Sequence, residues 1–92
     1  MTEIMTIEDS FLLPGKGAVI SGVNTLLDGE SGERIKALVS SRVRITHEGD
    51  EAIFEVKEVG VSESIVGKKN ISILLDCTDL AMLTRGRIVL TT

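Results

Sequence analysis

The sequence predicts an all-β domain that closes into a small barrel. Ile and Val are abundant and often alternate with polar residues, and glycine-containing turn signals recur at short intervals, which is typical of short strands joined by tight turns. No segment has the periodicity of a long amphipathic helix. Closure is expected because it pairs the edge strands, which otherwise expose this apolar chain to aggregation. The 92 residues, 42% of them hydrophobic, are expected to form one domain around one core.

Six or seven strands are expected. The first ends at Pro14–Gly15, a turn-forming pair because proline presets one dihedral angle and glycine tolerates positive φ. Gly22 inside the second indicates a bulge or a sharp barrel corner. Residues 28–33 are polar, carry two glycines and predict a mobile loop. The expected strands cover residues 4–13, 18–27, 34–40, 42–46, 52–61, 71–76 and 87–91.

The second half of the chain carries three further local signals. Residues 47–50 predict a hairpin turn. In the strand 52–61 the apolar residues occupy even positions at Phe54 and Val56 but odd positions at Val59 and Val61. The side of the strand that faces the core therefore changes near Lys57–Glu58, which predicts a bulge there. Residues 80–83 are the one stretch expected to form a helical turn, with Asp79 as its N-cap.

Composition and charge narrow the function classes. The formal net charge is −4, which excludes DNA and disfavours RNA, because phosphate affinity depends on Lys and Arg displacing counterions. Phe11 and Phe54 are the only aromatic residues of the sequence, so it lacks the stacking platforms of single-strand binders.

Targeting signals are absent from the sequence. Cys77 stands alone and cannot form an intrachain disulfide. The first residues are acidic, unlike a secretory signal, and no apolar run approaches the roughly 20 residues of a membrane helix. We therefore expect a cytoplasmic protein with no membrane contact.

Four short motifs occur in the order of a known family. Residues 7–11 read Ile-Glu-Asp-Ser-Phe, and residues 14–22 read Pro-Gly-Lys-Gly-Ala-Val-Ile-Ser-Gly. Residues 70–75 read Asn-Ile-Ser-Ile-Leu-Leu, and residues 83–90 read Leu-Thr-Arg-Gly-Arg-Ile-Val-Leu. Together they resemble the second domain of elongation factor Tu and related translational GTPases, with its Gly-Arg-Gly-Thr-Val-Val-Thr-Gly, Asn-Val-Gly-x-Leu-Leu and Arg-Gly-x-Val-Leu motifs.

The resemblance implies a six-stranded Greek-key-like barrel of the translation-factor second-domain type, here a free-standing single domain over residues 1–92. In elongation factor Tu this domain helps to hold the aminoacylated end of tRNA, and Asn70 matches a position of that contact. Here Lys69 replaces the family's acid, one residue is inserted at Lys68–Lys69, and Asp76–Cys77 stands where the family has Arg-Gly.

The sequence predicts no enzyme, cofactor or metal site. Six residues separate Gly60 from Gly67 where a phosphate loop has four, and Lys69 takes the place of the magnesium-binding Ser or Thr. Nucleotide binding is therefore excluded. Cys77 and His47 are the only pair for nucleophilic catalysis by cysteine, and nothing in the sequence brings them together. One Cys and one His cannot supply the four ligands of a structural zinc site.

A basic surface is the candidate binding site. Arg42 and Arg44, with Lys36, are expected to alternate on an outer sheet face, where they either meet a partner or pair with Glu55 across the sheet. The candidate residues are Lys16, Arg42, Arg44, Lys68, Lys69 and Asn70.

We expect a non-enzymatic binding module that contacts a protein partner through its loops and one sheet face. Two alternatives stay open. The first is contact with a tRNA end or a ribosomal component through Lys16, Lys68, Lys69 and Asn70, which would weaken steeply with salt. The second is an accessory or regulatory subunit of an enzyme, which would co-purify with a catalytic chain.

Overall fold

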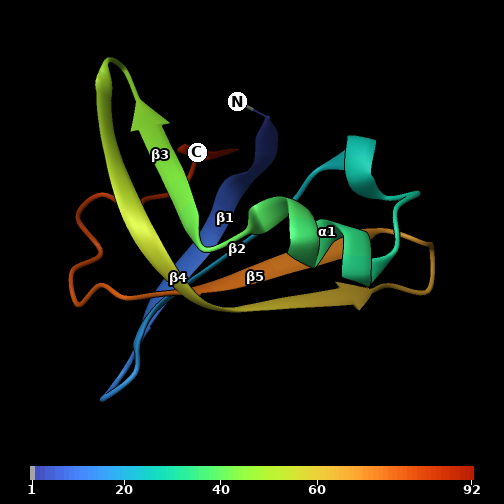
Figure 1. Cartoon of the computed structure of the whole chain (residues 1–92), viewed down its shortest axis with the longest axis horizontal. Coiled ribbons are helices and arrows are strands. Elements are labelled where there is room, and N and C mark those ends of the chain that lie inside the picture. Colours follow the sequence, from blue (N-terminus) through green and yellow to red (C-terminus); the bar gives the residue numbers. More distant parts are fainter. Residues whose placement is uncertain (1) are drawn as a thin grey trace.

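Six antiparallel strands form one sheet that closes in a ring in this computed structural model, which describes residues 2–92. The strands pair in the order β1-β2-β5-β4-β3-β6, and β6 pairs back to β1 (Figure 1). The protein is therefore mainly β, with one short helix. The elements are β1 Glu3–Leu13, β2 Gly17–Val23, a 3₁₀ turn η1 Thr25–Leu27, helix α1 Gly32–Val39, β3 Arg42–His47, β4 Asp50–Glu63, β5 Lys69–Leu75 and β6 Ile88–Thr91.

The core fills the inside of the ring and is entirely apolar among the described residues. Inward positions alternate along β5, where Ile71, Ile73 and Leu75 are fully buried, as expected for a strand with one wet face. The buried core residues are Ile4, Met5, Ile7, Ala18, Ile20, Ile35, Val39, Val43, Ile45, Ile71, Ile73, Leu75, Leu83 and Val89.

The turns and the bulge expected from the sequence are confirmed. Lys16 N donates to Leu13 O at 2.9 Å across the Pro14–Gly15 turn, where Gly15 has φ +78°. The 47–50 turn joins β3 to β4 as expected. The β4–β5 register shifts between Val56 and Glu58, where the change of parity predicts a bulge.

The expected strand over residues 34–40 is wrong, because Gly32–Val39 forms α1. Ser31 caps the helix by accepting from Arg34 N, which satisfies an amide that the first turn leaves unpaired. Ile35 and Val39, four residues apart, are buried on one face, and α1 lies against β4. Lys36 therefore lies on a helix and does not alternate with the arginines of β3.

Two other boundaries differ from expectation. The second strand ends at Val23 instead of Leu27, since the Asn24 side chain accepts from Leu26 N and opens η1. The Asp79 side chain accepts from Ala81 N, as expected of a cap, but residues 80–83 form turns and no helix. Neither helical segment of residues 2–92 is long and apolar enough to cross a membrane.

Gly22 marks a close approach of β1 to β2. The bulge lies in β1, where the register shifts between Ile7 and Asp9 opposite Gly22 and Ser21. A Cβ on Gly22 would lie 2.1 Å from the backbone oxygen of Thr6. No side chain fits in that space, so glycine is required for packing.

Gly22→Ala is expected to destabilise the protein by about 2–3 kcal/mol, because two backbone segments must move apart. Gly60→Ala is the matched control, since a Cβ there meets no atom within 4 Å, and less than about 0.5 kcal/mol is expected. Urea unfolding measures both. An unchanged midpoint for Gly22→Ala would contradict the close approach.

Candidate functional site

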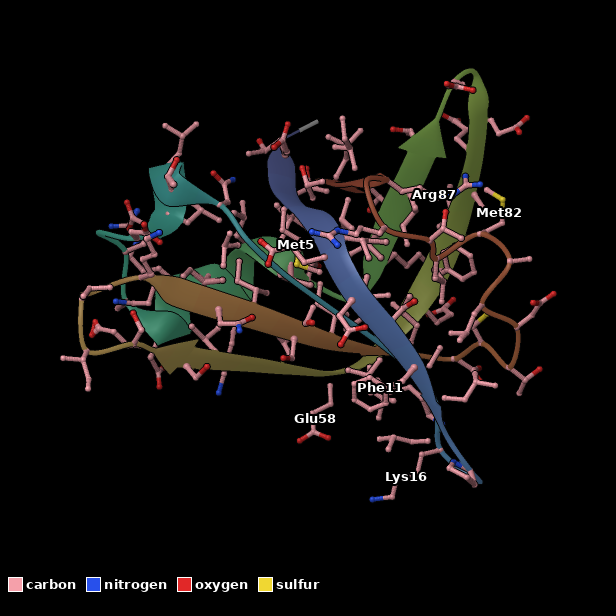
Figure 2. All side chains as sticks on the ribbon, turned by 180° about the vertical axis from the view of Figure 1, so that it is seen from behind. Met5, Phe11, Lys16, Glu58, Met82 and Arg87 are labelled. Carbon is pink, nitrogen blue, oxygen red and sulfur yellow. The ribbon has the colours of Figure 1, made fainter. Side chains whose placement is uncertain are left out.

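The structure distributes the six candidate residues over three places instead of one. Lys16 lies at the tip of the β1–β2 hairpin (Figure 2), and Arg42 and Arg44 lie on β3. Lys68 and Asn70 lie at the β4–β5 turn and the start of β5, on the side of the molecule opposite the hairpin tip (Figure 1). No single basic surface joins all six.

Lys69 is part of an internal clamp. Its ammonium lies 2.7 Å from Glu63 Oε2 and donates to the backbone oxygen of Asp28 at 3.3 Å. Its backbone N donates to Asp28 Oδ1 at 3.0 Å, and only 13% of its side chain is exposed. Lys69 therefore fastens the segment after η1 to β5 and has little charge left for an external anion.

The arginines of β3 are paired with acids of β4. Arg42 stands opposite Glu55 in the register, and Arg42 Nε lies 3.1 Å from Glu55 Oε1, which confirms the cross-strand pair expected from the sequence. Arg44 makes an ion pair with Glu51. An exposed pair such as Arg42–Glu55 contributes about 0–1 kcal/mol, and Arg44 is only 24% exposed in its pair. The two pairs compensate the positive charge of β3.

A row of three apolar residues and one glutamate crosses four strands on the outer face of the sheet at the hairpin end. Phe11 stands opposite Val19, Val19 opposite Leu74, and Leu74 opposite Glu58. Directly opposed residues share a face, and Figure 2 labels Phe11 and Glu58, the two ends of this row. Phe11 is 45% exposed although it is one of the two aromatic side chains. We call Phe11, Val19, Leu74 and Glu58 the hairpin row.

A hollow lies on each side of the hairpin. The hollow beside the hairpin row has a volume of about 220 Å³ and is lined by Leu13, Val19, Glu58, Gly60, Ser72 and Leu74. The larger one, of about 410 Å³, is lined by Leu12, Leu13, Pro14, Gly15, Lys16, Gly17, Lys57, Asp76 and Thr78. The Lys57 ammonium donates to the backbone oxygen of Lys16 at its rim.

The sequence contained a signal for the hairpin row that composition arguments missed. The runs 11–13, 18–20 and 73–75 are each three consecutive apolar residues, so each places at least one apolar side chain on the outer phase of its strand. A strand with one buried face needs apolar residues only at the alternate positions that point to the core. The additional apolar residues point to the outer face, where exposed apolar side chains mark an interaction surface.

The described residues contain no group of three His, Cys, Asp or Glu side chains arranged to hold a metal ion. The Cys77 thiol donates to the backbone oxygen of Asp79 at 3.1 Å. The side chain of His47, the other residue considered for catalysis, lies outside the described part of the structure.

No family model, curated protein or solved structure matches the chain. The resemblance to the second domain of elongation factor Tu therefore stays a prediction.

Lys69→Ala is expected to destabilise the fold by about 1–2 kcal/mol, because it leaves a partly enclosed contact with Asp28 and Glu63 unmade. Lys68→Ala is the control, since the Lys68 side chain is exposed and a change within about 0.5 kcal/mol is expected. Thermal and urea unfolding measure both variants. Equal effects would show that the clamp contributes nothing.

Proposed function

We propose that this protein is a non-enzymatic binding module that contacts a protein partner through the hairpin end. In this proposal it is a six-stranded barrel of the translation-factor second-domain type. The observation that carries the function is the hairpin row, in which the exposed Phe11 continues into the half-buried Val19 and Leu74 on the outer face of the sheet. Contiguous exposed apolar surface of this kind marks interaction sites.

The charge distribution supports a protein over a polyanion. The net charge is −4, and Arg42, Arg44 and Lys69 each make an ion pair with an acid of β4. An aromatic anchor beside small hollows is the arrangement that concentrates binding energy at protein interfaces, where a few well-packed side chains dominate.

A capture experiment tests the proposal. The immobilised chain is exposed to a lysate of the source cells, and the eluate is sorted into protein and RNA. Phe11→Ser is expected to lower capture of the bound protein at least tenfold, because it removes the apolar anchor. Leu26→Ser is the matched control: Leu26 is 87% exposed on η1, away from the hairpin, and capture should not change. Equal capture by both variants would refute the hairpin end as the contact.

Contact with an RNA end is the second candidate, and one observation favours it. The hollow of about 220 Å³ has apolar walls from Leu13, Val19 and Leu74 with the Glu58 carboxylate among its lining groups. Apolar walls can sandwich one base, and a carboxylate accepts hydrogen bonds from a base amine. In this reading Lys16, on the same hairpin, meets the backbone phosphates.

Short single-stranded RNA tests this second function by fluorescence anisotropy. Binding is expected at low salt, with an affinity that falls steeply as salt rises and is lowered by Glu58→Gln, which weakens the acceptor. Ser62→Ala, on the same strand but outside both hollows, is the control. The absence of any binding at low salt would remove RNA from consideration.

A further inference from the structure

The outer edge of β1 loses its neighbouring strand halfway along. β6 pairs with β1 only from Glu3 to Thr6. Beyond that, Ile7 N donates to Arg87 O and Ile7 O accepts from Gly86 N, both at 2.8 Å. β1 continues to Leu13, and no described strand pairs the outer edge of residues 9–13. Figure 1 shows this part of the hairpin projecting beyond the other strands.

Two contacts show which backbone groups point to that edge. Leu13 O accepts from Lys16 N, so Leu13 faces β2. Ser10 N donates to the Asp9 side chain at 2.9 Å, so Ser10 faces away from β2. Backbone groups alternate along a strand, and both observations therefore place Ser10 and Leu12 outward. The N–H of Leu12 and the carbonyls of Ser10 and Leu12 face the open edge.

Only another extended segment offers the alternating donors and acceptors that such an edge needs. Asp9 covers one of its donors, the N–H of Ser10, which shields the edge from unspecific pairing. The N–H of Leu12 has no such cover, and the Leu12 side chain is 46% exposed beside the larger hollow.

The side chains around the edge define the incoming strand. Its residues would alternate between the face that carries Phe11 and the face that carries Leu12. Both side chains are exposed and apolar, and Leu12 lines the larger hollow. At the turn end of this edge the larger hollow is lined by two cations, Lys16 and Lys57, and one acid, Asp76, whereas Glu8 and Asp9 lie at the other end of the edge. Charge complementarity therefore places an acidic residue of the partner at the turn end.

A second copy of the chain fits this edge less well. Edge-to-edge pairing of residues 9–13 engages five residues on each side, against roughly 20–30 residues on each side of a stable interface. A flexible peptide can also reach the larger hollow, which Leu12 lines beside the open edge.

We propose that residues Asp9–Leu13 of β1 bind an extended segment of a partner protein as an added β-strand, with apolar residues alternating over the two faces and an acidic residue near Lys16. This rests on the proposed protein-binding function and specifies how the partner is held.

Selection of random ten-residue peptides displayed on phage, with the immobilised full chain as bait, supplies the probe. The expected peptides have alternating apolar residues and an acid at one end. Leu12→Pro, which removes the outward N–H at an edge position that tolerates proline, is expected to weaken a selected synthetic peptide at least tenfold more than Leu12→Ala does. Leu12→Ala keeps the N–H and controls for the side chain.

Amide hydrogen exchange of the wild-type chain tests strand addition without any variant. Bound peptide is expected to slow exchange at Leu12 at least tenfold, with less than twofold change at Phe11 and Leu13, whose amides already face β2. Failure to select any peptide, or selected peptides that leave Leu12 exchange unchanged, would overturn strand addition. Self-association in sedimentation that Leu12→Pro abolishes would also overturn it in favour of a second copy.

The two proposals fail separately. If Phe11→Ser abolishes capture from lysate while no peptide protects Leu12, the partner binds the sheet face without adding a strand. If the chain captures no protein at all, the binding function itself fails, whatever peptides are selected.

Discussion

The double pairing of β6 is the constraint on which the rest of the structure depends. This strand spans only Ile88–Thr91, yet it pairs with β3 on one side and β1 on the other and so closes the ring. Closure pairs the facing edges of β3 and of the first part of β1, and it seals an apolar interior. Because β1 has eleven residues and β6 only four, the same pairing leaves the far half of β1 uncovered.

The bulge in β1 determines where the unpaired half of this strand points. The register shift between Ile7 and Asp9, opposite the close approach at Gly22, lies where β1 leaves β6. A bulge bends and twists its strand, so the hairpin beyond it projects past the ring. The interior and the exposed hairpin end are thus two consequences of one pairing pattern.

The cross-strand register also decides which charges remain available. Arg42 faces Glu55 because β3 and β4 are joined by a tight hairpin that fixes their pairing. Lys69, the first residue of β5, similarly stands opposite Glu63 of β4. Several cations that looked available in the sequence are therefore compensated, and at the hairpin end the exposed side chains of Phe11 and Leu12 remain as apolar surface.

Much of the fold could be predicted from local patterns, and the site could not. The Pro14–Gly15 turn and the bulge near Lys57–Glu58 follow from the preferences of a few adjacent residues. Helix α1 was missed because its cap, Ser31, lies in a glycine-containing polar stretch that also suits a loop. Packing of its buried face against β4 stabilises a helix too short to persist alone.

The sequence by itself determined most of the strands, most of their turns and the acidic balance of the surface, because these depend on residue type and on neighbours within a few positions. The tertiary structure alone decided that Phe11, Val19, Leu74 and Glu58 form one row and that part of β1 has an open edge. Both depend on the order and register of strands far apart in the chain, and these are set by how all the apolar faces together enclose one core.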